Sequence, residues 1–292
     1  MACLSARELR LGSNRVAAAL ALGLFGAACR HPGADSDGSS GWRADSRANA
    51  VPVADGGALL RPASSRSPSW HAALREHRAE REQMVEAQLV ARGIEDPRVL
   101  SVMRTVPRHR FVPERIRHGA YLDGPLPIPG EQTISQPYIV AFMTEAAQIR
   151  EGARCLEIGT GSGYQAAVLA ELCRETYTIE YLPEVAEFGR RNLEALGYLE
   201  RSVFVRTGDG YAGWPDRAPF DVILVTAAPE RVPQPLLQQL ALRGHLVIPV
   251  GPEAEQRIEV WNRLSAGDGQ RAFARQQLIG VRFVPFLGPQ GK

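Results

Sequence analysis

From residue 155 onward, short apolar runs of strand length alternate with longer segments of helical composition. The run at 221–226 is almost continuously apolar, as expected of a strand that a parallel sheet buries on both faces. This alternation predicts a doubly wound α/β sheet, in which ligands bind at the carboxyl ends of the strands. Two later runs, 258–264 and 277–284, predict a terminal antiparallel pair. The predicted strands are 155–158, 176–180, 203–206, 221–226 and 245–250, and the predicted helices between them are 163–173, 183–196 and 233–242.

Residues 70–150 carry a different pattern. Apolar residues recur at helical spacing over 70–92, where Gly93 ends the helix, and a second short helix begins at Asp96-Pro97. Residues 107–135 are dense in Pro and Gly and predict an ordered, irregular loop, and a loop of this length inside a folded unit is usually functional. A third helix is predicted from Pro137 to about residue 149. The chain therefore divides into N-terminal helices with a loop at 70–150 and a ligand-binding sheet at 151–292.

The first 69 residues predict no folded domain. Arg7, Arg10 and Arg15 precede an apolar run at 16–28 that is too short to span a bilayer and is typical of a signal peptide. Cys29 follows this run where a bacterial lipoprotein would carry its lipid. The other interpretation is a disordered start whose hydrophobicity is accidental. Residues 31–69 are rich in Gly, Ser, Pro, Ala and Asp and predict a flexible linker.

Composition narrows the function without identifying it. The chain has 292 residues, of which 45% are hydrophobic and 23% charged, which is ordinary for a globular protein. Its net charge is only +2, and no basic cluster marks a surface for nucleic acid. The four cysteines form no C-x-x-C pair and have no histidine at metal spacing, so we expect neither a metal site nor a disulfide framework. Cys155 and Cys173 are interpreted as small core residues.

The first chemical motif lies at the end of the first predicted strand. Gly159, Gly161 and Gly163 stand at alternate positions between that strand and a helix, where bare backbone can approach a ligand closely. The G-x-G-x-G spacing is one residue shorter than the dinucleotide fingerprint. Glu157, just before the turn, would repel a pyrophosphate and would suit a ligand that carries an amine. S-adenosyl-L-methionine is such a ligand.

The ends of the later strands fit the same cofactor. Glu180 ends the second strand about twenty residues after the glycines, at the reach of a carboxylate that accepts ribose hydroxyls. Asp209 and Gly210 follow the third strand, where a carboxylate could bind the adenine amine. Thr226 begins a run of small residues after the fourth strand, which leaves space for the methionine part of the ligand. Each signal alone is weak, and the prediction depends on their combined order.

A polar loop precedes the cofactor segment. Thr133, Ser135 and Gln136 place hydroxyl and amide donors at the start of the helix that begins near Pro137, and a helix N-terminus favours anions. A second interpretation makes Ser135 the N-cap of that helix, and the two roles are compatible. No histidine lies in these motifs, so Ser135 is not expected to be a covalent nucleophile.

Over about residues 81–287, the chain resembles the protein-L-isoaspartate O-methyltransferase family. The most specific matches are the Thr-Ile-Ser-Gln-Pro block at 133–137 and the Val-Arg-Phe-Val-Pro block at 281–285. The chain departs from the family pattern at 129–131, where Glu131 stands in a link that often has shorter side chains. The other matching segments are 106–113, 125–128, 156–165, 208–210, 218–221 and 225–229.

This resemblance implies a Rossmann-like methyltransferase fold and a repair reaction. The family transfers a methyl group from S-adenosyl-L-methionine to the free α-carboxylate of L-isoaspartyl residues in damaged proteins and peptides. The ester then collapses to a succinimide that can reopen as normal aspartate. The resemblance makes Ser135 the catalytic residue and Thr133, Gln136 and Val284 substrate-binding residues. The expected cofactor-binding residues are Glu157, Gly159, Gly161, Gly163, Glu180, Asp209, Gly210 and Thr226.

Two other functions remain open from the sequence. One is a methyltransferase of a small-molecule acid, because one cofactor domain serves many substrates. The other is an inactive, surface-attached binding module. We expect a cytoplasmic location, because S-adenosyl-L-methionine is a cytosolic metabolite. The alternative, which the start of the chain and Cys29 favour, is export or a lipid anchor. Membrane attachment is expected only if Cys29 is lipidated, and no stable partner is evident.

Overall fold

The computed structural model describes residues 67–200, 202–267 and 272–289, all within a unit that spans Gly56–Lys292. The signal-like segment, Cys29 and nearly all of the predicted linker lie outside the described residues. Across the described ranges, no helix is both long and apolar enough to cross a membrane.

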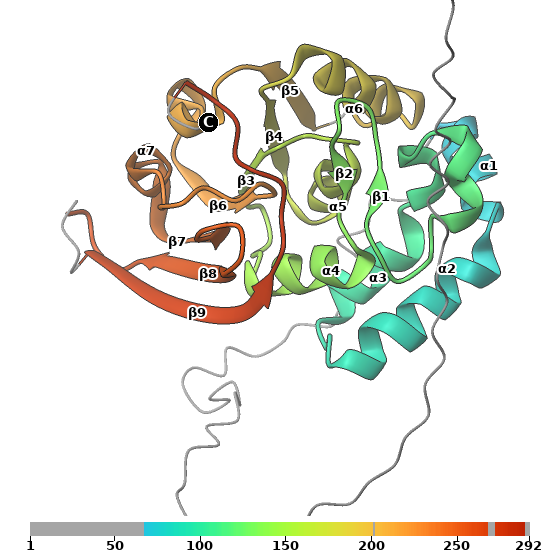
Figure 1. Cartoon of the computed structure of the whole chain (residues 1–292), viewed down its shortest axis with the longest axis horizontal. Helices are drawn as coiled ribbons and strands as arrows, with labels where there is room; N and C mark the ends of the chain where they lie inside the picture. Colours follow the sequence, from blue (N-terminus) through green and yellow to red (C-terminus); the bar gives the residue numbers. More distant parts are fainter. Residues whose placement is uncertain (1–66, 201, 268–271, 290–292) are drawn as a thin grey trace, which may run out of the picture. The chain divides into compact units, whose positions relative to one another are not determined.

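A seven-stranded mixed sheet organises the described residues, in the strand order β5-β4-β3-β6-β7-β8-β9 (Figure 1). Five neighbouring strands are parallel, and β8 and β9 continue the sheet in antiparallel pairing. The predicted doubly wound sheet with a terminal antiparallel pair is therefore confirmed. The strands are β3 (Arg154–Ile158), β4 (Glu175–Glu180), β5 (Val203–Thr207), β6 (Phe220–Val225), β7 (Leu240–Val250), β8 (Gln256–Arg263) and β9 (Phe273–Val281).

Alternate side chains of the central strands enter two separate cores. Cys155, Val222 and Leu224 belong to the core that also contains buried residues of the N-terminal helices, α4, α5 and α6. Leu156 and Ile223, one position along, belong to the core that contains α7. Burial on both faces explains why the central strands are almost continuously apolar. The α-helices from residue 97 onward are α3 (Pro97–Thr105), α4 (Pro137–Ala146), α5 (Tyr164–Leu172), α6 (Pro183–Ala195) and α7 (Gln234–Gln238).

The register of the parallel strands brings their carboxyl ends to one edge. Ile158 at the end of β3 pairs with Ile179 of β4 and with Val225 of β6. Glu180, the last residue of β4, pairs with Thr207, the last residue of β5. The loops that follow these four strands therefore begin side by side, as the doubly wound fold requires of a binding site.

The single helix expected over 70–92 is broken in the structure. Helix α1 (Pro68–Arg75) stops at Glu76, and His77 adopts a left-handed backbone with φ 49°. The chain then continues as α2 (Arg78–Met84), a π-helical turn at Val85–Leu89 and a 3-10 turn at Val90–Arg92. Arg81, which is buried, stabilises the break because its guanidinium donates to the carbonyl groups of Leu74 and Glu76.

The start of α3 and the end of the preceding helical segment agree with the sequence prediction. Asp96 caps α3 by accepting hydrogen bonds from the backbone N–H groups of Arg98 and Val99. Gly93 follows the Val90–Arg92 turn with φ 86°, a conformation that favours glycine.

The helix predicted at 233–242 is wrong in its second half. Helix α7 ends at Gln238, and strand β7 begins at Leu240, which pairs with Phe220 of β6. The reason is a long-range contact between β7 and β6. Gly244 of β7 lies so close to β6 that a Cβ at this position would stand 3.0 Å from the carbonyl oxygens of Phe220 and Asp221. Strand pairing therefore overrides the local helical composition.

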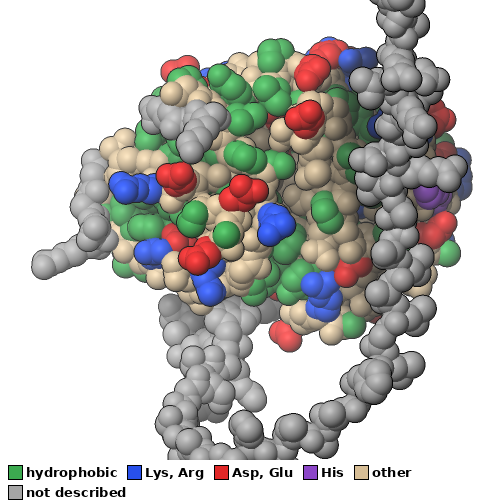
Figure 2. All heavy atoms as spheres, in the orientation of Figure 1, with side chains coloured by type: hydrophobic (Ala, Val, Ile, Leu, Met, Phe, Trp, Pro, Cys, Tyr) green, Lys and Arg blue, Asp and Glu red, His purple; other side chains and the backbone are tan. Residues whose placement is uncertain are grey.

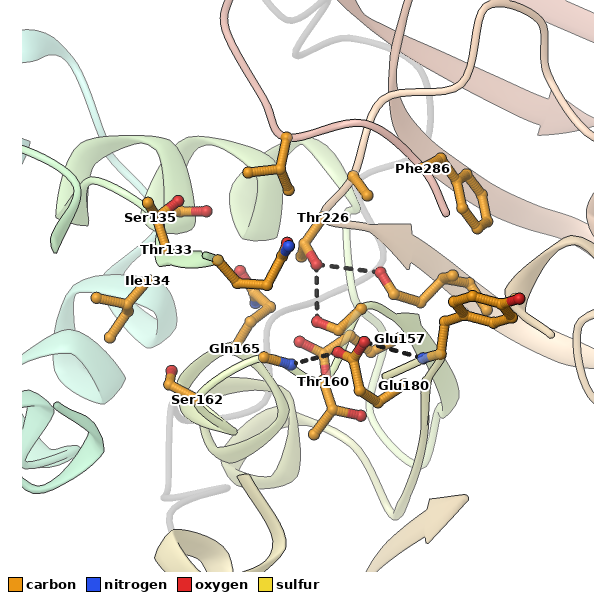
Figure 3. A pocket seen from close by; sticks show the side chains of 18 of the residues that line it. Thr133, Ile134, Ser135, Glu157, Thr160, Ser162, Gln165, Glu180, Thr226 and Phe286 are labelled. Carbon is orange, nitrogen blue, oxygen red and sulfur yellow. Dashed lines mark hydrogen bonds between the residues drawn. The ribbon is translucent and has the colours of Figure 1, made fainter. Parts of the chain in front are cut away.

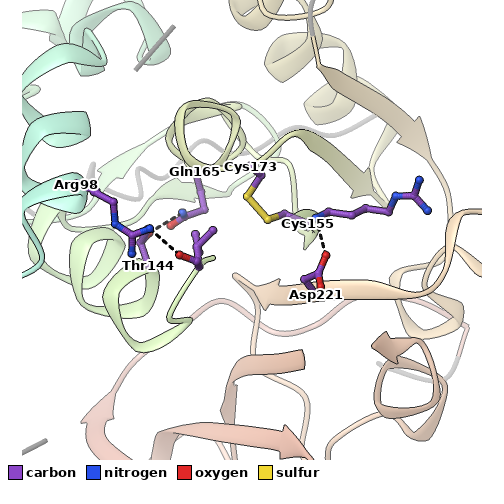
Figure 4. The surroundings of a disulfide bond; sticks show 8 residues. Arg98, Thr144, Cys155, Gln165, Cys173 and Asp221 are labelled. Atoms are coloured by element: carbon purple, nitrogen blue, oxygen red, sulfur yellow. Dashed lines mark hydrogen bonds between the residues drawn. A yellow bond between two sulfur atoms is a disulfide. The ribbon is translucent and has the colours of Figure 1, made fainter. Parts of the chain in front are cut away.

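A disulfide joins Cys155 of β3 to Cys173 at the end of α5 (Figure 4). The expectation that the cysteines form no disulfide was therefore wrong. The crossover from β3 through α5 returns the chain over the start of its own strand, so the two Cα atoms are 6.2 Å apart although 18 positions separate the residues. The C-x-x-C criterion misses such a pair, because the fold brings the cysteines together.

We expect reduction of this disulfide to lower the free energy of unfolding by about 3 kcal/mol, because a closed loop of this length restricts the unfolded chain by about that amount. Urea unfolding with and without dithiothreitol measures the difference. The Cys155→Ala, Cys173→Ala double variant is the control, and its transition should not respond to the reductant. Equal midpoints for the unsubstituted chain in both conditions would contradict a stabilising disulfide.

Candidate active site

A pocket opens at the carboxyl edge of the sheet, where residues from six separate segments meet (Figure 3). Ile158, Ile179 and Glu180 contribute the ends of β3 and β4. The pocket combines most of the residues that the sequence predicted for cofactor and substrate. Those among the lining residues are Thr133, Ser135, Glu157, Gly159, Gly161, Glu180, Gly210, Thr226 and Val284.

The glycine turn after β3 forms the floor of this pocket. Gly159 has φ 97° and Gly161 has φ 54°, both in the left-handed region. A Cβ at Gly159 would collide with the Thr226 hydroxyl, which instead donates to the carbonyl oxygens of Ile158 and Gly159. Gly163, with φ 85°, lies outside the lining and allows α5 to pack on Gly189 and Leu193 of α6.

Glu180 stands at the end of β4 with its carboxylate held by backbone amides. Its Oε2 accepts from the N–H of Gly161 at 2.9 Å, and its Oε1 accepts from Tyr181 at 2.9 Å and Leu182 at 3.1 Å. A carboxylate offers about four acceptor positions, so one remains for a further donor. The turn and the carboxylate therefore position each other.

Glu157 is the fully buried acid of the pocket. Thr178 donates to its Oε2 at 2.6 Å, whereas Oε1 has no hydrogen-bond partner. Removal from water raises the pKa of Glu157 to about 8, with a smaller contribution from the negative charge of Glu180, and the Thr178 hydroxyl opposes the shift. A buried carboxyl with an unpartnered oxygen favours a ligand that brings a donor or a positive charge.

The third carboxylate predicted for the cofactor, Asp209, lies beside the pocket. Its Oδ1 accepts from the N–H of Tyr211 at 2.9 Å and caps the turn at Gly210–Ala212. Gly210 does line the pocket, and a Cβ there would meet Ile158 and Phe286. The structure thus brings Gly210 into the lining and leaves Asp209 directly next to it.

The opposite wall is the polar loop before α4. Its hairpin consists of β1 (Leu126–Pro127) and β2 (Thr133–Ile134), and Ser135 follows directly. Figure 3 shows Thr133 and Ser135 on the side of the pocket away from Glu157 and Glu180. The prediction that Ser135 caps α4 is wrong, because Gln136 holds the N-cap position and no side chain caps the helix.

Gln136 does not enter the pocket. Its amide donates to Asp123 at 2.7 Å, on an exposed part of the loop. The Ser135 hydroxyl, by contrast, makes no hydrogen bond to any described residue and lines the pocket. Of the three predicted donors, Thr133 and Ser135 therefore lie at the site and Gln136 lies outside it.

The C-terminal segment closes the remaining side. The N–H of Ala228 donates to Val284, and the N–H of Phe286 donates back to Ala228, so the segment runs along the end of β6. Phe286 stacks on Tyr211 with ring centroids 4.1 Å apart. The predicted strand at 277–284 therefore ends at Val281, and the residues after it become a wall of the pocket.

Several lining residues were missed by sequence reasoning. Thr160 and Ser162 lie between the recognised glycines, so their position in the turn was the available signal. Phe286 directly follows the Val-Arg-Phe-Val-Pro block. Gln165 stands at the end of the matched segment 156–165, which was its available signal. Tyr181 carries no signal of its own, since its loop reaches the pocket only through folding.

The sheet order, the glycine turn and the pocket together define a Rossmann-like methyltransferase fold. One protein-L-isoaspartate O-methyltransferase of solved structure is 28% identical, with a TM-score of 0.62 over 72% of this chain and 67% of that one. Another solved structure, described as a putative protein-L-isoaspartate O-methyltransferase from Plasmodium falciparum in complex with S-adenosyl-L-homocysteine, is 23% identical. Its TM-score is also 0.62, over 71% of this chain and 98% of that one.

Residues 79–291 match the family model described as protein-L-isoaspartate(D-aspartate) O-methyltransferase, and the chain belongs to this family. A curated relative from Gloeobacter violaceus, named protein-L-isoaspartate O-methyltransferase, is 58% identical over 203 residues. The match covers 69% of this chain and 96% of the relative. The resemblance found in the sequence is therefore confirmed.

The buried Glu157 generates a prediction about pH. Its pKa of about 8 in the folded chain lies above the usual value of 4.5, so the folded state holds the proton more tightly than the unfolded state. The resulting stabilisation is present in full below about pH 4.5 and is lost as the pH rises through 8. As the pH rises from 5 to 9, the unsubstituted chain should therefore lose about 4 kcal/mol of its free energy of unfolding relative to Glu157→Gln, which has no proton to lose.

Chemical denaturation at several pH values measures this difference. Glu151→Gln, at an exposed position, is the matched control for substitution of a carboxyl by an amide. A difference for Glu157→Gln that stays constant from pH 5 to 9 would show that the Glu157 carboxyl is not perturbed by burial.

Proposed function

We propose that this chain transfers a methyl group from S-adenosyl-L-methionine to the free α-carboxylate of L-isoaspartyl residues in damaged proteins and peptides. The observation that carries the proposal is the pocket in which Ser135 and Thr133 face the glycine turn, Glu157 and Glu180. Membership of the family supports the substrate. The methyl ester formed in this way collapses to a succinimide, which can reopen as normal aspartate.

The residues at the carboxyl edge fit the cofactor. Glu157 has an unpartnered oxygen that suits the amine of the methionine part, and Glu180 retains an acceptor position that suits a ribose hydroxyl. Gly159 and Gly161 leave the backbone bare on that side. When bound, S-adenosyl-L-methionine supplies a methyl group on a positively charged sulfur. Asp209 and Gly210 would bind the adenine, Thr226 would hold the turn, and Gly163 would support it through helix packing.

The acceptor side would work by orientation. A carboxylate is already ionised at neutral pH, so it needs no general base. The Ser135 hydroxyl would donate to one carboxylate oxygen and leave the other free to attack, with Thr133 and Val284 positioning the peptide. No histidine lines the pocket among the described residues. His109, the buried histidine nearest to this loop in sequence, is bonded to Tyr121 and Glu76. A serine nucleophile is therefore not supported.

The walls of the pocket would exclude water from the reacting groups. Ile128 of the hairpin loop lies next to the glycine turn, where its Cδ1 atom is 3.6 Å from the position that a Cβ of Gly161 would take. Phe286 of the C-terminal segment lines the pocket on the other side. Holding two reactants in line in a site closed to water supplies much of the rate in such transfers. Gln136, outside the pocket, would act only by tying the loop to Asp123.

A methyl-transfer assay with an isoaspartyl peptide tests the proposal. The comparison substrates are the same peptide with normal aspartate and free small-molecule acids. We expect methyl transfer to the isoaspartyl peptide alone. Equal or preferred transfer to a small acid would instead support the small-molecule function, and no transfer to any of them would support the inactive binding module.

Ser135→Ala is expected to lower methyl transfer to the isoaspartyl peptide by roughly 10- to 1000-fold, as loss of a positioning contact does in other sites. Its affinity for S-adenosyl-L-homocysteine, measured by calorimetry, should stay unchanged, which controls for folding. Unchanged turnover in Ser135→Ala would remove the assigned role.

The compartment in which the chain works also belongs to this proposal. We propose that it is exported, because the buried disulfide between Cys155 and Cys173 favours an oxidising compartment over the cytoplasm. The supply of a cytosolic cofactor is the argument for the cytoplasmic alternative. Fractionation of cells that express the full-length chain, with Cys29→Ala as the control, distinguishes the two. Export with membrane release on Cys29→Ala supports a lipid anchor, and a cytoplasmic chain contradicts the proposal.

A further inference from the structure

A buried arginine lies directly behind the loop that carries Ser135. Arg108 is fully inaccessible to solvent. Its Nη2 donates to the carbonyl oxygen of Ser135 at 2.8 Å, and its Nε donates to that of Ala120 at 2.8 Å. The guanidinium therefore ties the loop at Ser135 to a segment 15 residues earlier in the chain, and it fixes the backbone from which the Ser135 hydroxyl projects.

The positive charge of Arg108 has no carboxylate partner. It takes part in no ion pair among the described residues. Its Nη1 makes no hydrogen bond of good geometry, and the Tyr164 side chain, whose ring centre lies 4.9 Å from the guanidinium carbon, offsets part of the cost of burying the charge. Burial lowers the pKa of Arg108 to about 10, so the group stays protonated near neutral pH. Burying an unpaired charge costs free energy, and an anion that binds nearby would offset that cost.

Arg81 is a second buried arginine of the same chain, and its guanidinium has a hydrogen-bond partner at every nitrogen. Its acceptors are the carbonyl groups of Leu74, Glu76 and Arg104 and the hydroxyl of Tyr121. Arg108 differs from it in having one nitrogen unused and in contacting two residues of the pocket wall, Ser135 and Tyr164.

We propose that Arg108 is a positioning and specificity-determining residue, whose buried charge makes the site at the Ser135 hydroxyl selective for an ionised carboxylate over a neutral group of the same shape. The guanidinium bonds to the backbone of the residue that carries this hydroxyl, and a buried environment screens charge poorly. The cation acts through space and through the Ser135 backbone, without touching the substrate. This inference rests on the proposed function, because it assumes that the substrate carboxylate binds at Ser135.

The test compares two peptides that differ only in charge. One carries the isoaspartyl α-carboxylate, and the other carries the α-carboxamide in its place. Their dissociation constants are measured by calorimetry with S-adenosyl-L-homocysteine present, for the full chain, Arg108→Gln, Arg108→Lys and Arg81→Gln. The measured quantity is the ratio of the two constants, which a general loss of folding stability does not change.

The unsubstituted chain should prefer the carboxylate by at least roughly tenfold, since attraction between opposite charges in a poorly screened site is worth about that much. Arg108→Gln should bring the ratio close to one, and Arg108→Lys, which keeps the charge, should keep most of the preference. Arg81→Gln should lower stability and leave the ratio unchanged. A ratio that is preserved in Arg108→Gln would overturn the inference, as would equal weakening of both peptides.

Arg108→Lys keeps the inference falsifiable if Arg108→Gln does not fold, because a collapse of the preference in Arg108→Lys contradicts a role for the charge. Failure of the proposed function is a different result. In that case the unsubstituted chain does not methylate the isoaspartyl peptide at all, whatever the ratio in the variants.

Discussion

The left-handed backbone of the glycine turn is the constraint on which this site depends. Gly159 and Gly161 allow the chain to leave β3 beneath the Thr226 hydroxyl and beside the Glu180 carboxylate, and both side chains bond to the turn. The ends of β3, β4 and β6 are locked together in this way. The disulfide holds the first strand to the end of the following helix, so both elements that flank the turn are fixed.

Two buried ionisable groups of opposite type then distinguish the walls of the pocket, an acid on the glycine side and a cation behind Ser135. Glu157 has an unpartnered carboxyl oxygen on the glycine side, and Arg108 has an unpartnered guanidinium nitrogen behind Ser135. A positively charged methyl donor and a negatively charged acceptor match this division. On the outer face that Figure 2 shows, acidic and basic side chains are interspersed.

The sequence predicted what depends on local pattern. The parallel strands, the glycine turn and the cap of α3 by Asp96 follow from periodicity and from residue types at short spacing. What escaped prediction depends on contacts between distant positions. Leu240 became a strand residue because it pairs with Phe220, and Cys173 bonds to Cys155 because a crossover returns the helix to its strand.

The residues of the site divide in the same way, into those that a local motif indicates and those that only distant contacts place. Glu157, Glu180 and Ser135 were recognised from motifs and lie in the pocket, whereas the orientation of Gln136 toward Asp123 has no local signal. Arg108 stands in a matched block, but nothing nearby indicates that its guanidinium reaches Ser135, 27 positions later. Side-chain direction within a loop is set by tertiary packing, which a single sequence does not display.

The most direct test of the account is a crystal structure of the chain with S-adenosyl-L-homocysteine and an isoaspartyl peptide. We expect the adenosyl group beside Glu180 and Gly210, and one oxygen of the peptide α-carboxylate within hydrogen-bond distance of the Ser135 hydroxyl. A peptide whose α-carboxylate lies away from Ser135, with the cofactor product still at the glycine turn, would contradict the assignment of the acceptor site.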